Sequence, residues 1–372
     1  MIIWLASLVV NGSNVLPFAF AGSLLPHQWH AHEMLFGYTL AVNAGFLLTA
    51  VPSWTKTRPI QGFVLGALAA VWVAGRAAVW GSAYLPGEIV AVIDLAFVPV
   101  VLLAIAPAVM ANWTPRNIIF LPILGAMLAA NLLVHLDLLG VTEGTVGAGH
   151  GLALNTAVVL IAILGGRMVP AFTTNALKKK GEADLPVSRK PVEVASILSI
   201  VVWGVMDVMP AAEVYAGFAA AIAAAVHAVR YAGWRGYRTL DEPIVWIMHF
   251  AYLWLVIGLG LKAVAGLSGA VDNVTAVHAL SAGAIGCMTM AIMTRAALGH
   301  TGRVIKAAPG IVGAYFLLGG AVVIRVVVPI WLPALHHGAL AVSGGLWAAA
   351  FTIMFWGYAP ILLRRRLGEP AG

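Results

Sequence analysis

The segment His30-Ala31-His32-Glu33 places two imidazoles and a carboxylate at the start of an apolar stretch covering about residues 31–52. Ionisable side chains at the end of a membrane helix are costly unless they meet a partner, a proton or a metal. His30 and Glu33 share a helical face, whereas His30 and His32 differ by about 200° around an ideal helix axis. We therefore expect metal or proton chemistry here, with His30 and His32 serving different partners or lying in a loop before the helix.

The elements that position this motif are membrane helices. The chain is 62% hydrophobic and only 9% charged over 372 residues, which is typical of a polytopic membrane protein. Because a bilayer span needs about 20 apolar residues, the chain divides into roughly twelve spans. We predict an all-α bundle forming a single integral membrane domain over residues 1–372, with no internal repeat. The predicted spans lie near residues 2–25, 31–52, 62–80, 88–111, 117–136, 148–170, 191–209, 212–229, 244–266, 273–297, 307–329 and 338–362.

The net charge of +7 reflects membrane topology. Of the 21 Lys and Arg residues, 18 fall in or beside alternate loops, and the opposite loops have none. The positive-inside rule assigns the basic loops to the cytoplasm, so both termini are expected to be cytoplasmic. The basic residues therefore predict contact with a lipid bilayer and no nucleic-acid partner. They are Lys56, Arg58, Arg116, Arg167, Lys178, Lys179, Lys180, Arg189, Lys190, Arg230, Arg235, Arg238, Arg295, Arg303, Lys306, Arg364, Arg365 and Arg366.

This topology gathers most of the histidines on the outer side. A metal site in a helical bundle is built from side chains on facing helices, and the outer histidines come from several spans. The single cysteine, Cys287, excludes a multi-thiolate zinc site and the attachment motif of c-type haem, so any metal needs mainly nitrogen and oxygen ligands. Eight of the eleven histidines are expected at outer ends: His27, His30, His32, His135, His150, His278, His336 and His337.

Four further ionisable residues lie within the outer halves of the predicted spans. The cations Arg76, Lys262 and Arg325 suit anionic groups such as haem propionates, which need charged or hydrogen-bonding partners in a membrane. The fourth residue is Asp94, and a structural ion pair between Arg76 and Asp94 is the alternative interpretation. Glu33 and Asp94 could orient ligands or pass protons.

Arginines also gather beside glycines at the predicted inner ends of two spans. Arg167 closes the sixth span, and Arg295 and Arg303 close the tenth. They could close a cytoplasmic cleft or bind an anionic lipid or phosphate. The alternative is ordinary positive-inside topology with glycines that end helices.

Three segments of the chain resemble the NnrS family of bacterial inner-membrane proteins. They are HAHEM followed by FGYTLAVNAGFLLTAVPSWT, then GGRMVPAFT, and HALSAGAIGCMTMAIMTRAALGHTGR. The resemblance covers almost the whole chain from Trp29 onward. It implies about twelve membrane helices, haem and copper, and a role in the response to nitric oxide and nitrosative stress. The matching positions are His30, His32, Glu33, Arg76, His150, Arg167, His278, Arg295, His300 and Arg303.

Residues and resemblance together suggest a haem b and copper pair in the outer half of the bundle that binds nitric oxide. Haem iron and copper both accept imidazole. Glu33 and Asp94 would orient ligands or carry protons, and Arg76, Lys262 and Arg325 would neutralise propionates. The candidate metal ligands, not divided between the two metals, are His30, His32, His135, His150 and His278.

Three functions stay open at this point. The protein could bind or detoxify nitric oxide and so protect against nitrosative stress without rapid turnover. It could be an oxidoreductase that forms nitrous oxide with electrons from quinol or an external carrier, although the sequence has no electron-entry domain. It could be a secondary transporter, although its charged cluster is expected in the outer half and not at the midplane.

Overall fold

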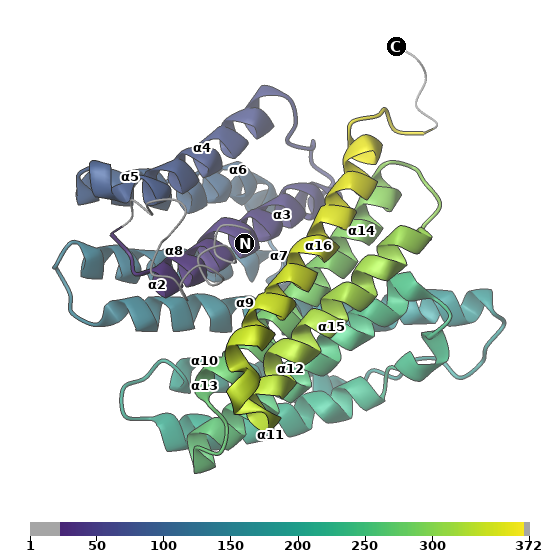
Figure 1. The fold of residues 1–372 in the computed structure, drawn as a ribbon. Helices are drawn as coiled ribbons and strands as arrows, with labels where there is room; N and C mark the ends of the chain where they lie inside the picture. Colours follow the sequence, from purple (N-terminus) through teal and green to yellow (C-terminus); the bar gives the residue numbers. More distant parts are fainter. Residues whose placement is uncertain (1–22, 368–372) are drawn as a thin grey trace. The chain divides into compact units, whose positions relative to one another are not determined.

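The computed structural model describes residues 23–367, and these residues form helices and connecting turns without a strand (Figure 1). Their contacts divide the chain into two compact units, one ending at Ala157 and the other beginning at Val158. The long helix α9 (Thr145–Lys179) contributes to both. Each unit is described by itself, and we refer to them as the first and the second unit.

The first unit contains four long helical stretches before α9, and two of them are subdivided. The opening stretch changes from α-helix to π-helix and back, and α5 continues into α6. Its elements are α2 (Pro26–His32), η1 (Glu33–Thr39), α3 (Leu40–Thr55), α4 (Phe63–Trp80), η2 (Ser82–Tyr84), α5 (Gly87–Leu95), α6 (Phe97–Ala111), α7 (Pro115–Ile118), α8 (Phe120–Leu138) and the start of α9.

The second unit begins with the remainder of α9 and also contains a helix that changes to π-winding. Several of its helices begin with proline in the first turn, where the missing N–H group costs nothing. Its further elements are α10 (Lys190–Met206), α11 (Glu213–Ala232), η3 (Gly236–Thr239), α12 (Pro243–Ser268), α13 (Asn273–His278), η4 (Ala279–Gly286), α14 (Cys287–His300), α15 (Pro309–Trp331), η5 (Pro333–Leu335) and α16 (His336–Leu362).

Ten helices of the described residues are long and apolar enough to cross a membrane. The helix α10, with 17 residues, corresponds to the seventh predicted span. The first predicted span, near residues 2–25, lies almost entirely outside the described residues. The prediction of an all-α polytopic membrane bundle is confirmed, with about twelve as an approximate number of spans.

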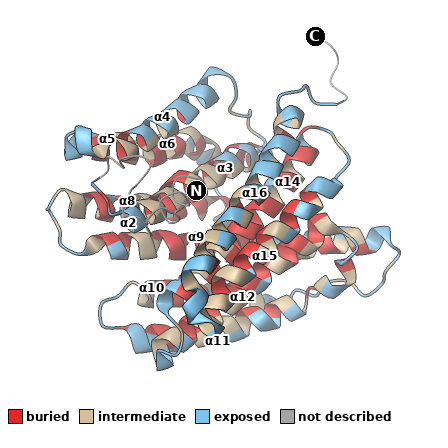
Figure 2. Cartoon of the chain, viewed as in Figure 1, coloured by how far each residue is buried: buried red, intermediate tan, exposed pale blue. Residues whose placement is uncertain are grey.

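Exposed residues lie along the outer surfaces of many helices (Figure 2), and many of them are large and apolar. Phe63 is 89% exposed, and Trp331 is 76% exposed. Such surfaces are unusual in a soluble protein but are expected where lipid tails cover a helix. The exposed apolar residues therefore agree with a protein that crosses the membrane several times.

A polar network lies inside the second unit. Arg230 of α11 forms an ion pair with Glu193 of α10 and donates hydrogen bonds to the Ala162 carbonyl (2.7 Å) and to the Tyr252 hydroxyl (3.0 Å). The Tyr252 hydroxyl in turn lies 2.6 Å from Nδ1 of His227. The network joins four helices, α9 to α12, through groups that would be costly to bury alone.

The network predicts that Arg230→Ala strongly destabilises the protein. Removing one partner of a buried ion pair leaves an uncompensated charge and unsatisfied acceptors, at a cost of about 3 kcal/mol. The free energy of unfolding can be measured by titrating the purified protein with a denaturing detergent.

The matched control is Arg235→Ala. Arg235 pairs with Asp184 at 3.2 Å, but their side chains are 33% and 50% exposed. An exposed pair contributes about 1 kcal/mol or less. Equal losses of stability in the two variants would contradict a structural role for the Arg230 network.

Candidate metal centre

A change of helical winding directly follows the first histidine of the centre, His32. The helix α2 ends at His32, and the π-helix η1 follows from Glu33 to Thr39. A π-turn contains an extra residue, so it rotates the side chains that follow and often occurs at functional sites. His32 is fully buried, whereas His30 is partly exposed. The expected divergence of the two imidazoles therefore arises on a helix.

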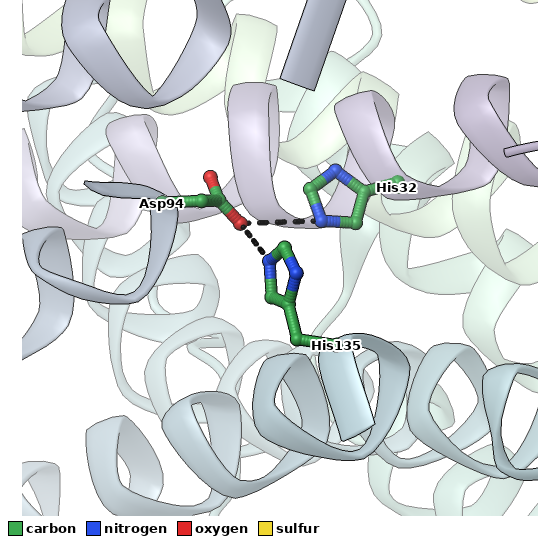
Figure 3. Close-up of side chains that lie close together, drawn as sticks. All are labelled: His32, Asp94 and His135. Carbon is green, nitrogen blue, oxygen red and sulfur yellow. Dashed lines mark hydrogen bonds and ion pairs between the residues drawn. The ribbon is translucent and has the colours of Figure 1, made fainter. Parts of the chain in front are cut away.

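Three buried residues from three helices form the core of the centre. His32 of α2, Asp94 of α5 and His135 of α8 each offer one ligand atom, and these atoms lie within 4.8 Å of one another. Nε2 of His135 lies 2.9 Å from Oδ2 of Asp94, and Nε2 of His32 lies 3.3 Å from the same oxygen. Figure 3 shows both imidazoles directed at the carboxylate. The structure thus brings together three of the residues selected from the sequence.

Arg76 of α4 joins this core to Glu33. Its Nη1 donates to Oε1 of Glu33 at 2.6 Å, and its Nη2 pairs with Oδ1 of Asp94. The structure therefore contains the ion pair between Arg76 and Asp94, which the sequence analysis gave as the alternative to propionate binding by Arg76. Two carboxylates and one guanidinium leave one negative charge, which a protonated imidazole or a metal cation can balance.

Asn131 is a member of the site that the sequence analysis did not select. Its Nδ2 donates to Oδ2 of Asp94 at 2.8 Å, so its Oδ1 accepts the hydrogen bond from Nε2 of His32 at 3.0 Å. Asn131 lies four residues before His135 on α8 and therefore shares its helical face. The sequence feature that could have identified Asn131 is a polar amide side chain one helical turn from a candidate ligand in an otherwise apolar helix.

His150 lies beside the three-residue core. Its ring centroid is 6.4 Å from that of His32 and 6.3 Å from that of Phe36. Its Nε2 is buried and has no hydrogen-bond partner among the described residues. A buried polar atom without a partner is costly, and a lone pair on an imidazole nitrogen is a good metal donor. His150 therefore fits a ligand of a bound metal better than it fits an apolar packing position.

The donor set as a whole fits a metal ion. Imidazole nitrogens suit copper, iron and zinc, and a carboxylate adds the negative charge that a cation requires. Asn131 and Arg76 would orient the ligand Asp94 without binding the metal themselves, because both donate hydrogen bonds to its carboxylate. Hydrogen bonds of this kind fix the orientation of ligands in metal sites.

The remaining candidate site residues lie in the second unit. Lys262 of α12 contacts both carboxylate oxygens of Asp207 at 2.9 Å, so its charge is balanced within the chain. His278 donates from Nδ1 to the Val274 carbonyl at 2.7 Å and accepts at Nε2 from Nη2 of Arg325 at 2.9 Å. Ligation by His278 and His30, and propionate binding by Arg76, Lys262 and Arg325, stay predictions.

Two of the arginines predicted at the inner ends have defined contacts. The guanidinium carbon of Arg295 lies 3.7 Å from the ring centroid of Phe172, a cation–π contact between α14 and α9. Arg303 donates to the Thr301 carbonyl at 3.3 Å. These contacts give the two arginines local packing roles.

Fold and site define a polytopic helical membrane protein with a buried His-Asp-His group that could hold a metal. The family model described as NnrS protein matches residues 1–366, so the chain belongs to the NnrS family and the resemblance is confirmed. A search of curated proteins finds no relative. Membership supports a membrane protein of the nitric oxide response, in a family associated with metal and haem binding.

The role of Asn131 gives a prediction about metal affinity. Asn131→Leu removes one donor to Asp94 and one acceptor for His32 but leaves all candidate ligands in place. Loss of such a supporting group weakens metal binding about 10–100-fold. Titration of the purified protein with copper against a competing chelator measures the affinity.

Asn112→Leu is the control, because Asn112 is exposed at the end of α6. Its affinity for copper is expected to equal that of the unchanged protein. An Asn131→Leu protein with full affinity would show that Asn131 does not support the centre.

Proposed function

We propose that this protein binds nitric oxide at a haem and copper centre and protects the cell against nitrosative stress. The observation that carries the proposal is the buried group of His32, Asp94 and His135, with an unpartnered nitrogen of His150 beside it. Membership of the NnrS family supports the connection with nitric oxide.

His32, Asp94 and His135 are the ligands that we assign to copper. Two imidazoles and a carboxylate suit copper and leave coordination positions for a small ligand. Haem b iron would take an imidazole from His30 or His150, the candidates in the same unit. Ligation by His278 is a separate prediction, because both of its ring nitrogens are hydrogen-bonded, to the Val274 carbonyl and to Arg325. When bound, the two metals supply the coordination and redox chemistry for nitric oxide.

The protein residues control charge and access at this centre. Arg76 holds the Asp94 carboxylate from one side, and Asn131 holds it from another. Phe36 is 1% exposed and lies beside the rings of His32 and His150, where it excludes water. A dry, apolar surrounding favours an uncharged diatomic ligand over water and ions.

Reduction of nitric oxide to nitrous oxide is the second candidate function, favoured by the position of Glu33. The Glu33 side chain is 21% exposed, lies 3.4 Å from Nδ1 of His32 and contacts Arg76 at 2.6 Å. It is therefore placed to carry protons between solvent and the buried centre. Electrons would come from quinol or an external carrier.

Transport has less support. The buried charges of Arg76 and Lys262 are both compensated within the chain, which is expected of a structural or catalytic site, so these two positions, and not Arg325, count against transport. A transport site would need charges left available for a substrate.

The proposed setting is the bacterial inner membrane, with both termini in the cytoplasm. The alternating distribution of Lys and Arg supports this orientation. His135 and His150 lie on either side of the connection between α8 and α9, which this orientation assigns to the periplasmic side, and the ring centroid of His32 lies 5.9 Å from that of His135. The centre would then be open to nitric oxide arriving from the periplasm.

The test measures copper, haem and nitric oxide consumption in the purified full chain. Asp94→Asn preserves the shape of the side chain but removes the charge, and His135→Ala removes one imidazole. Both variants are expected to lose most of their copper, because a coordinating group is removed. His337→Ala, at an exposed position, is expected to retain it.

The outcomes separate the candidate functions. Metals that bind nitric oxide without consuming it would support binding and protection. Nitrous oxide formed in proportion to an added electron donor would support the enzyme. A protein that takes up neither metal, or an Asp94→Asn variant with unchanged copper content, would overturn the proposed centre.

A further inference from the structure

The order of helices repeats three times along the described chain. Each copy has an opening helix, a second helix, a short turn, a third helix and a fourth helix. The first copy covers 26–138 and the second 145–268, while the third covers 273–362 and shows its first three helices in the described residues. The opening helices of the first and third copies both change to π-winding directly after a histidine, at His32 and at His278.

The opening helices share a common register. His32, His150 and His278 are each followed, 23 residues later, by a threonine: Thr55, Thr173 and Thr301. Each threonine hydroxyl donates to the carbonyl four residues before it, at 2.8, 2.7 and 2.6 Å, and each threonine is buried. The expectation of no internal repeat was therefore wrong.

The turns before the third helices support the same alignment. They contain Leu85-Pro86, Met209-Pro210 and Leu332-Pro333. A proline at this point restricts the residue before it to an extended conformation and so ends the preceding helix. The three copies can thus be compared element by element.

The second helix of each copy carries one charged residue near its C-terminal end. These residues are Arg76 in α4, Asp207 at the end of α10 and Arg325 in α15. Arg76 is balanced by Glu33 and Asp94, and Asp207 is balanced by Lys262. In two copies, the chain itself therefore supplies the opposite charge.

The third copy lacks that opposite charge. The residue after the histidine is Glu33 in the first copy but Ala279 in the third. The position eight residues after the turn proline is Asp94 in the first copy but Ala341 in the third. Within the described part of the chain, Arg325 forms no ion pair with a carboxylate, and its hydrogen-bond partner is Nε2 of His278.

We propose that Arg325 and His278 form a binding site for a small oxyanion or carboxylate that takes the place of Glu33 and Asp94 in the third copy. A guanidinium within a membrane span needs a negative partner, and it binds planar anions through paired hydrogen bonds. His336, the first residue of α16, lies within electrostatic range of Arg325 and of Asp272, and the adjoining His337 is exposed. The proposal does not depend on the metal centre in the first unit.

Nitrite is the probe for this site, because it is a small planar oxyanion. The full chain in lipid-free detergent is titrated with sodium nitrite at constant ionic strength, and binding is measured by calorimetry. Arg325→Gln is expected to weaken binding by about tenfold or more, because a charge-assisted hydrogen bond is replaced by a neutral one. Arg364→Gln, which removes an exposed cation, is expected to leave the affinity unchanged.

A second variant supplies the missing carboxylate from within the chain. Ala279→Glu places an acid directly after His278, as Glu33 follows His32 in the first copy. If that carboxylate pairs with Arg325, nitrite binding is expected to fall by about tenfold or more. Copper content, measured in parallel, is expected to stay unchanged in both variants, so failure of the metal proposal would be visible separately.

The source of the natural anion is tested in lipid nanodiscs. Weaker nitrite binding with phosphatidylglycerol than with phosphatidylcholine, if the difference is lost in Arg325→Gln, would support the site and identify an anionic lipid headgroup as its occupant. Equal binding in both lipids would support a free anion. Unchanged nitrite affinity in both Arg325→Gln and Ala279→Glu, or loss of haem from Arg325→Gln without loss of nitrite binding, would overturn the proposal.

Discussion

The carboxylate of Asp94 is the group on which the organisation of the first unit depends. It is 3% exposed, and a charge buried so deeply in an apolar bundle requires several compensating donors. Arg76, Asn131, His32 and His135 supply them from α4, α8 and α2. Four helices are therefore held around one buried charge, and the same requirement brings two imidazoles close enough to share a metal ion.

The fold could be predicted from composition, but only part of the site could. His32, Asp94 and His135 stood out because ionisable groups are costly in membrane helices. Asn131 did not, since a neutral amide is common enough in such helices to pass unnoticed. The sequence also left His30 and His32 equal as ligands. The full burial of His32 and its contact with Asp94 distinguish them in the structure.

The threefold repetition was hidden for a related reason. The copies share few identical residues, because lipid-facing positions accept almost any apolar side chain. The positions that persist are those with a structural role. Examples are the threonines whose hydroxyls donate to a carbonyl of their own helix, Thr55, Thr173 and Thr301. The charge near the end of the second helix differs in sign between copies, as Arg76 and Asp207 illustrate, so comparison of residue types alone misses it.

The repetition also shows why a metal centre fits the first copy. Its opening helix carries Glu33 and its third helix carries Asp94, so two carboxylates face the single cation Arg76. The excess negative charge must be met by a proton on an imidazole or by a metal ion. A metal ion would replace that proton, because ligand nitrogens bind metals in the neutral form, and binding would release the proton. In the third copy, the alanines leave the opposite imbalance, an excess positive charge on Arg325. One helical scaffold thus presents a site for a cation in one copy and a site for an anion in another.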